Sequence, residues 1–373
     1  MKTPLFIFFC IINAFMLFAH GAELPEGFFE TQVTTELEDP TSLKFSPDGR
    51  LFVLQQTGQI RVLKNGALLS QPFLKLDVDG RGEHGLLGLE FDPEFDSNSY
   101  VYVYYTALTP AIHNRVSRFT AQGDQALEGS EKIILELDDV GLSIFHSAGA
   151  LHFSPDNASA DKKLFIGVGD NANRKNAQLK SNPFGKILRI NADGSIPQDN
   201  PFYNTTTGIG RAIWAYGFRN PFSFHFQRGT DRMYINDVGA ESWEDIKEGF
   251  IGKNYGWPLA EGYSNNPDLV SPIYSYPHGP TTSETEGCAI SGGAFYDSDN
   301  LAFPKRFQGQ YFFMDYCSGW LRVLNPQDHT VSPFGKGLAS NPVSLEVGPD
   351  GKFYFLSRWL HGLFAIEYNP KLN

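Results

Sequence analysis

Clusters of basic residues are missing from this sequence. Its 30 lysines and arginines are outnumbered by 42 aspartates and glutamates, and they are spread along the chain. A protein that binds nucleic acid or an anionic membrane concentrates positive charge on one surface, so the sequence disfavours both kinds of partner. Phosphate-binding glycine loops, zinc signatures and serine nucleophile elbows are missing as well.

Long apolar segments are missing after the N-terminus. The first apolar run covers residues 5–19, follows Lys2 and precedes small residues around Gly21 and Ala22. This pattern predicts a secretory signal peptide over residues 1–21, with an uncleaved membrane anchor as the alternative. We therefore expect the mature chain, residues 22–373, to be exported to the periplasm or the extracellular space and to have no membrane span.

Cysteine is scarce, with three residues in the whole chain. Cys10 lies in the predicted signal peptide, which leaves Cys288 and Cys317 as an even pair. In an oxidising compartment we expect this pair to form one disulfide.

The residues that are abundant are those of short strands and tight turns. The chain has 37 glycines and 32 phenylalanines, and aromatic residues make up 14% of it, whereas charged residues make up only 19%. This composition favours an all-β protein over a helical one.

A unit of strand, turn and strand recurs along the chain. Its copies begin near Phe45, Phe91, Phe153, Phe224, Phe307 and Val347. Six such units predict a six-bladed β-propeller formed as one domain, and residues 29–37 are expected to supply a strand that closes the ring with the last unit. Two β-sandwich domains are the alternative, but no linker rich in Pro, Ser or Gly divides the sequence.

Polar residues that could carry chemistry are concentrated between residues 145 and 258. His146 follows an apolar approach, so we expect it near the mouth of the propeller, where a neutral imidazole could remove a proton from a substrate hydroxyl. Asp170 ends a predicted strand and could orient that imidazole or simply cap a turn. Arg219, beside Asn220, could stabilise a developing negative charge, bind a planar cofactor, or form an internal salt bridge.

An acidic loop follows in the same region. It begins with Gly239 and Ala240, ends downstream at Tyr255, and contains three carboxylates, those of Glu241, Glu244 and Asp245. Because calcium binds carboxylates together with backbone carbonyls, the loop predicts a calcium site, with an acidic surface turn as the alternative.

Taken together and in order, these motifs resemble the soluble quinoprotein glucose and sorbosone dehydrogenases. The motifs concerned are Phe145-His146, Gly169-Asp170, and residues 185–201, 217–221, 237–239 and 254–258. Members of that family are six-bladed propellers that oxidise aldose sugars with pyrroloquinoline quinone and calcium. The likeness extends over nearly the whole mature chain.

The resemblance implies roles for the candidates that would act on the sugar and the quinone. His146 matches the family's catalytic base, Asp170 the carboxylate that supports it, and Arg219 with Asn220 the pair that contacts the quinone. The implied reaction removes the proton of the sugar's anomeric hydroxyl at His146, transfers a hydride to the quinone and yields a lactone. An electron acceptor would then reoxidise the cofactor.

The resemblance also implies two calcium sites. Gly239 and Ala240 match the positions whose backbone carbonyls hold the calcium of the cofactor. Asp245 and Tyr255 match a second calcium site.

The sequence departs from the family in places that bear on cofactor binding. His84 stands where the family often has Gln, and it is expected to contact the cofactor. The fifth-blade segment, residues 315–320, lacks the cations that hold the quinone's carboxylates in characterised enzymes, and Arg322 and Lys253 are the nearest candidates. The pair of cysteines resembles a disulfide-stapled subgroup, which is also similar to the propellers of hedgehog-interacting-type proteins, where the scaffold binds and does not catalyse.

The leading hypothesis is therefore an exported aldose dehydrogenase that depends on pyrroloquinoline quinone and calcium. The alternative is a non-catalytic secreted propeller that binds a protein or a glycan on its loop face. A calcium-dependent lactone hydrolase is a third hypothesis, which rests on fold analogy alone.

Overall fold

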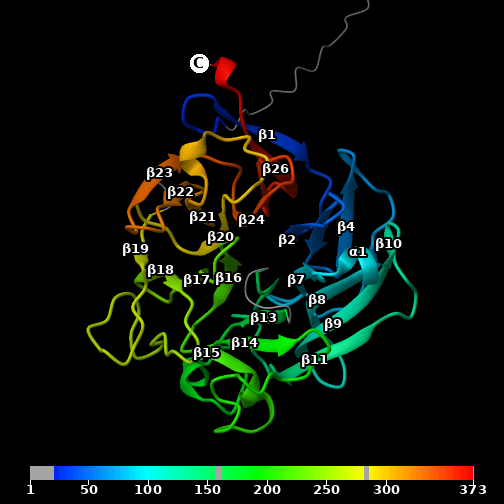
Figure 1. The fold of residues 1–373 in the computed structure, drawn as a ribbon, viewed down its shortest axis with the longest axis vertical. Coiled ribbons are helices and arrows are strands. Elements are labelled where there is room, and N and C mark those ends of the chain that lie inside the picture. The colour runs from blue at the N-terminus through cyan, green and yellow to red at the C-terminus, as the bar shows by residue number, and fades with distance from the viewer. Residues whose placement is uncertain (1–20, 156–161, 281–284, 373) are drawn as a thin grey trace, which may run out of the picture.

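Six small antiparallel sheets surround a common axis in the computed structural model (Figure 1). The structure describes residues 21–155, 162–280 and 285–372. The predicted signal peptide lies outside these residues, except for Gly21. In the described part of the chain, no helix is long and apolar enough to cross a membrane.

Each sheet is one blade, and its strands follow one another from the axis outward. The first blade contains β2 (Pro40–Phe45), β3 (Leu51–Gln55), β4 (Gln59–Lys64), β5 (Ala67–Leu68) and β6 (Leu74–Lys75). The second contains β7 (Leu86–Phe91), β8 (Tyr100–Ala107), β9 (His113–Gln122), β10 (Gln125–Ala126) and β11 (Lys132–Asp139). The third contains β12 (Ala148–Phe153), β13 (Lys163–Val168), β14 (Lys186–Asn191) and β15 (Ile213–Tyr216). The short helix α1 (Phe95–Asn98) joins β7 to β8.

The other three blades are built in the same way. The fourth contains β16 (Pro221–Phe226), β17 (Met233–Asp237), β18 (Trp243–Glu248) and β19 (Tyr274–Pro277). The fifth contains β20 (Ile290–Phe295), β21 (Tyr311–Asp315), β22 (Leu321–Leu324) and β23 (Val331–Gly335). The sixth contains β24 (Pro342–Val347), β25 (Phe353–Ser357), β26 (Gly362–Tyr368) and β1 (Phe28–Thr34).

The innermost strands form a closed ring. Strands β2, β7, β12, β16, β20 and β24 each contact the next, and β24 contacts β2. The predicted six-bladed β-propeller is thus confirmed, and the alternative of two sandwich domains is wrong. In a ring of six, blades one and four face each other across the axis, as do blades three and six.

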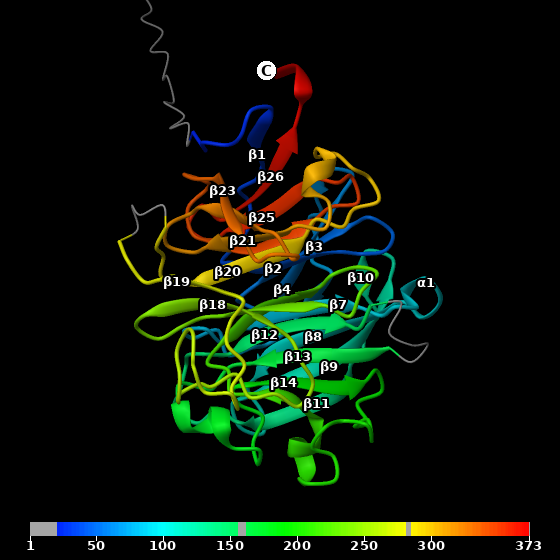
Figure 2. The same cartoon turned by 60° about the vertical axis from the view of Figure 1, so that its left-hand side comes forward.

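The N-terminal strand closes this ring, as predicted from residues 29–37. Strand β1 pairs antiparallel with β26, from Phe28 opposite Tyr368 to Thr34 opposite Leu363, and the two strands lie side by side in both views (Figures 1 and 2). The last blade therefore contains strands from both ends of the described chain.

The repeated turn explains why the blades have this form. In the first blade the turn after β2 ends at Gly49, which has a φ of +84°, and the chain then enters β3, all of whose residues are buried. Glycine adopts this left-handed conformation without the strain that a Cβ would cause. The second strand of a blade packs against both neighbouring blades, which accounts for its continuous apolar run.

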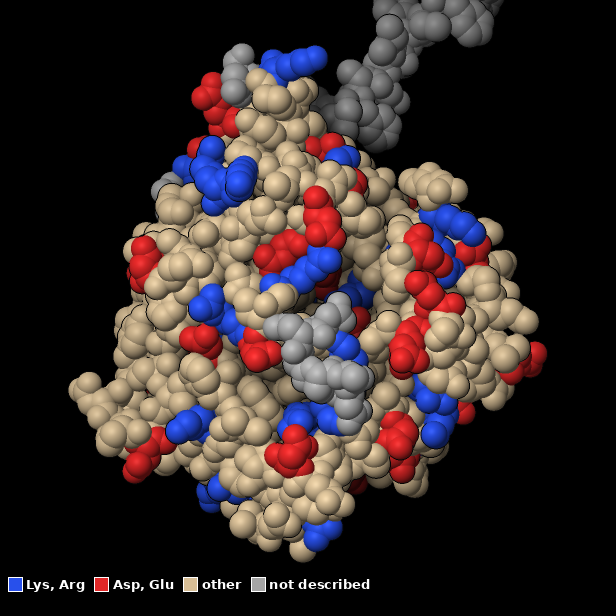
Figure 3. Space-filling view, in the orientation of Figure 1, with Lys and Arg blue, Asp and Glu red and all other residues tan. Residues whose placement is uncertain are grey.

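Charged side chains are mixed on the molecular surface. On the face shown in Figure 3, lysines and arginines are interspersed with aspartates and glutamates. This face presents no large surface of one charge.

Candidate functional site

The predicted base and its carboxylate are in contact. Nδ1 of His146 lies 2.7 Å from Oδ1 of Asp170, and Oδ2 of Asp170 accepts a hydrogen bond of 2.8 Å from Nε1 of Trp257. Asp170 is only 1% exposed. Because a carboxylate accepts hydrogen bonds, Nδ1 carries the proton and the lone pair of Nε2 is left to act as a base.

The backbone holds this pair at the inner end of the third blade. His146 has a φ of +60° just before β12, and Asp170 follows β13. A Cβ on Gly169 would lie 1.9 Å from the carbonyl oxygen of His146, so only glycine allows the two segments to approach this closely.

Glu83 joins the third and fourth blades, a role that the sequence did not suggest. Its Oε2 accepts hydrogen bonds from the backbone N–H of His146, at 2.9 Å, and from Nδ2 of Asn220, at 3.1 Å. Glu83 lines the central cavity. The sequence predicts a cofactor contact for its neighbour His84, which stands where the family often has Gln.

His84 itself has a different environment from the one predicted. It is 1% exposed, its Nδ1 lies 2.9 Å from Oδ2 of Asp79, and its Nε2 is buried without a partner among the described residues. It is not one of the described residues that line the cavity. Its contact with a cofactor stays a prediction, and Glu83 is the residue of this turn that reaches the cavity.

The Arg219 and Asn220 pair is anchored from behind by a buried aspartate. Oδ1 of Asp237 accepts hydrogen bonds from the backbone N–H groups of Arg219, at 3.1 Å, and Asn220, at 2.8 Å. Nη1 of Arg219 donates to the carbonyl of Val238 at 3.1 Å, and Oδ1 of Asn220 is buried without a partner among the described residues. Such an orphaned acceptor is expected where a ligand completes the site.

The predicted calcium loop directly follows these residues. The N–H of Gly239 lies 3.2 Å from Oε1 of Glu244, and the N–H of Ala240 lies 2.9 Å from Oε1 of Glu261. Among the described residues, no hydrogen bond ends on the carbonyl oxygen of Gly239 or of Ala240. Carbonyl oxygens without a donor are suitable ligands for a hard cation.

The residues of the predicted second calcium site have separate partners. Asp245 receives a hydrogen bond of 2.6 Å from Ser275, and its Oδ2 lies 3.3 Å from the ammonium of Lys247. The hydroxyl of Tyr255 donates to the carbonyl of Glu248 at 2.6 Å. The cation beside Asp245 is thus a lysine, and calcium binding there stays a prediction.

A central cavity of about 370 Å³ lies beside these groups. The innermost strands of all six blades contribute to its wall, and Glu83, Asn220 and Val238 line it next to His146 and Arg219. The candidate site is therefore at the end of the cavity where the innermost strands begin.

Arg358 supplies a cation on the far wall of this cavity. Among the described residues that line it, the lysines and arginines are Lys44 and Arg358. Arg358 follows β25 in the sixth blade, opposite His146, and its Nη2 donates to Oε1 of Gln56. Arg322 and Lys253, the candidates from the sequence, do not line the cavity in the described structure.

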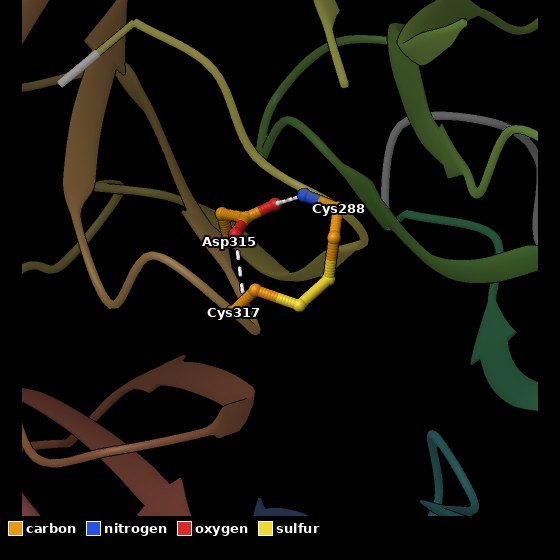
Figure 4. Close-up of side chains that lie close together, drawn as sticks. All are labelled: Cys288, Asp315 and Cys317. Carbon is orange, nitrogen blue, oxygen red and sulfur yellow. Dashed lines mark hydrogen bonds between the residues drawn. A yellow bond between two sulfur atoms is a disulfide. The ribbon is translucent and has the colours of Figure 1, made fainter. Parts of the chain in front are cut away.

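The predicted disulfide is confirmed, and an aspartate holds both of its ends (Figure 4). Asp315 accepts hydrogen bonds from the N–H of Cys288, at 2.9 Å, and from the N–H of Cys317, at 3.0 Å. Ala289 and Tyr316, which adjoin the two cysteines, line the cavity. The disulfide therefore braces the wall of the cavity in the fifth blade.

The match to known proteins agrees with this geometry. The family model described as Glucose / Sorbosone dehydrogenase matches residues 37–362. The chain belongs to this family. It is 28% identical to the aldose sugar dehydrogenase YliI of Escherichia coli, over 86% of this chain and 88% of that one. It is also 28% identical to quinoprotein glucose dehydrogenase B of Acinetobacter calcoaceticus, over 67% of this chain and 56% of that one.

The chain is also similar to a hedgehog-interacting protein and to a solved dehydrogenase structure. Hedgehog-interacting protein of Mus musculus is 29% identical over 87% of this chain and 47% of that one. The solved structure of the aldose sugar dehydrogenase of Escherichia coli in its apo form has a TM-score of 0.76 at 24% identity, and covers 92% of this chain and 99% of that one. At this identity the structural likeness supports the fold alone.

Proposed function

We propose that this protein is an exported dehydrogenase that oxidises the anomeric hydroxyl of aldose sugars to lactones with pyrroloquinoline quinone and calcium. The observation that carries the proposal is the His146 and Asp170 pair at 2.7 Å, beside Arg219, Asn220 and the carbonyls of Gly239 and Ala240. Membership of the family and the two dehydrogenase relatives support it.

The residues present fit such a cofactor. In the described part of the chain, Oδ1 of Asn220 is buried without a partner and the carbonyls of Gly239 and Ala240 accept no hydrogen bond, which leaves them available to calcium. Arg358 offers a guanidinium to a carboxylate on the far wall. Pyrroloquinoline quinone, when bound with calcium, would supply the acceptor for the hydride of the sugar.

The chain's own residues would accept the proton of the anomeric hydroxyl and stabilise the charges that develop in the reaction. Nε2 of His146 would take the proton of the anomeric hydroxyl, and Asp170 would stabilise the resulting imidazolium while Trp257 keeps the carboxylate in place. Arg219, held over Trp257 at 5.9 Å from the ring centroid, would stabilise negative charge that develops nearby.

Reconstitution tests the proposal directly. The purified protein should bind pyrroloquinoline quinone in the presence of calcium, as measured by absorbance, and then reduce an artificial electron acceptor when aldoses are added. His146→Ala should lower turnover by about a thousandfold, while quinone affinity stays within a factor of about three. His329→Ala, which removes an exposed histidine far along the chain in the fifth blade, is the matched control. Failure of the wild-type protein to bind the quinone would refute the proposal.

A second function is favoured by one specific observation. Hedgehog-interacting protein of Mus musculus is 29% identical over 87% of this chain, so a non-catalytic propeller that binds a protein or a glycan is the alternative. That alternative predicts no turnover in the wild-type protein or in His146→Ala.

A further inference from the structure

The loop after β17 turns several successive peptide groups in the same direction. Four backbone N–H groups converge on a single oxygen, Oε1 of Glu261: those of Ala240 at 2.9 Å, Glu241 at 3.0 Å, Ser242 at 2.9 Å and Trp243 at 3.2 Å. Glu261 belongs to the long segment between β18 and β19, so this arrangement depends on tertiary contact and not on the loop alone.

The direction of the carbonyls follows from the geometry of the peptide group. In a planar trans peptide, the C=O of one residue points opposite to the N–H of the next. The N–H groups of Ala240 and Glu241 point to Glu261, so the carbonyls of Gly239 and Ala240 point away from that carboxylate.

The carbonyl of Val238 follows the same rule. The N–H of Gly239 points to the buried carboxylate of Glu244, so the carbonyl of Val238 points away from that carboxylate. It accepts the hydrogen bond of 3.1 Å from Nη1 of Arg219, and Val238 lines the cavity. Three successive carbonyls thus turn away from two carboxylates.

Glycine is required for this turn. A Cβ on Gly239 would lie 1.6 Å from the carbonyl oxygen of Trp243 and 3.1 Å from Oε1 of Glu261. Glu261 and Gly239 therefore pack against each other at the base of the loop.

We propose that Glu261 is a positioning residue that presents the carbonyls of Gly239 and Ala240 to a calcium ion. Its carboxylate gathers the N–H groups on one side of the loop, and the carbonyl oxygens are left on the other side as preformed ligands. Without an anion behind them, carbonyls that face the same way repel one another, and the loop would lose this arrangement. The proposal rests on the proposed function for the identity of the ion.

Terbium luminescence on the quinone-free protein provides a readout that does not depend on turnover. Terbium substitutes for calcium, and excitation of Trp243 in the same loop should sensitise it. Glu261→Ala should weaken terbium binding, and its displacement by calcium, by about tenfold or more, because the charge-assisted hydrogen bonds to the loop are lost. Glu261→Gln keeps an acceptor oxygen but not the charge, so it should lose less terbium affinity than Glu261→Ala.

Asp268→Ala is the matched control. It removes the same charge from the segment between β18 and β19 that contains Glu261, and the side chain of Asp268 is exposed. Wild-type affinity in Glu261→Ala, or an equal loss in Asp268→Ala, would overturn the proposal. Circular dichroism should show that Glu261→Gln is folded, so that the terbium affinity of a folded variant is compared with that of the wild type.

The two proposals fail in different ways. If the affinity for terbium falls as expected but the wild-type protein neither binds the quinone nor oxidises sugars, the proposed function is wrong and the role of Glu261 stands. If the quinone binds and sugars are oxidised but Glu261→Ala holds the ion as the wild type does, only the role of Glu261 is wrong.

Discussion

Asp170 sets the chemistry of His146 through one hydrogen bond. It keeps the proton on Nδ1 and carries a negative charge toward the imidazole. Asp170→Asn preserves the shape but removes the charge, and the amide can favour the opposite tautomer. Turnover of the reconstituted enzyme should fall by about a thousandfold or more, with quinone affinity nearly unchanged.

Trp257→Phe separates this effect from simple loss of packing. It removes the hydrogen bond of 2.8 Å to the other oxygen of Asp170 and keeps an aromatic ring beneath Arg219, so turnover should fall by about tenfold. Equal turnover in Asp170→Asn and the wild type would contradict the role of the carboxylate.

Glu346 makes stability depend on pH at the other end of the cavity. It lies among Lys44, Glu90, His152 and His225, and burial raises its pKa to about 7 although Lys44 opposes the shift. A carboxyl whose pKa is raised in the folded state stabilises the fold below its unfolded pKa, and this contribution is lost as pH rises through about 7.

Glu346→Gln should therefore reduce the loss of thermal stability between about pH 5 and about pH 8. Thermal unfolding of both proteins across this range measures the effect. Glu128→Gln, at an exposed position, should follow the wild-type curve. If the thermal stability of Glu346→Gln falls with pH as steeply as that of the wild type, this carboxyl is not the source of the pH dependence.

Several residues of the site could be predicted from the sequence, and others could not. His146, Asp170, Arg219 and Asn220 each adjoin a recognisable motif next to a strand. Arg358 lies outside those motifs, in a turn of the sixth blade that reaches the cavity only because the ring closes. No local pattern distinguishes such a residue from an ordinary turn.

At the scale of the element, the fifth blade shows what a disulfide adds to a loop. Cys288 and Cys317 are separated by 29 residues and join the segment before β20 to the turn after β21. Replacing both by serine should lower the free energy of unfolding by about 3 to 4 kcal/mol, since the unfolded chain regains the entropy of that loop. Denaturant unfolding measures this difference.

The wild-type protein in reductant should match the double variant, and reductant should not change the variant further. Asp315 would still hold both segments through the N–H groups of residues 288 and 317. If the double variant is as stable as the wild type, the hydrogen bonds of Asp315 are enough to hold the fifth-blade wall of the cavity.

Strands were easier to predict than the segments between them. Continuous runs of aromatic and aliphatic residues specify β3, β8 and β25 because each is packed between sheets on both faces. The segment between β18 and β19 has no such pattern. Its role becomes visible only when Glu261 meets the N–H groups of residues 240–243.

At the scale of the whole molecule, one N-terminal strand completes the ring. The number of repeated units predicted six blades, and the prediction that residues 29–37 close the ring with the last unit is confirmed by the pairing of β1 with β26. Phe28, in β1, is 8% exposed and packs against aromatic rings of the fifth and sixth blades. Its ring centroid lies 4.8 Å from that of Phe303, 4.9 Å from Phe334 and 4.7 Å from Tyr368.

Phe28→Ala should therefore destabilise the whole propeller and not only one blade. Loss of a buried phenylalanine typically lowers the free energy of unfolding by about 3 to 5 kcal/mol, because both burial and packing are lost. Gln32→Ala on the same strand is the control, since Gln32 is exposed and its backbone pairing with Phe364 is unaffected. Denaturant unfolding followed by tryptophan fluorescence should show one cooperative transition at a lower midpoint. A separate early transition would instead mean that β1 detaches while the ring stays closed.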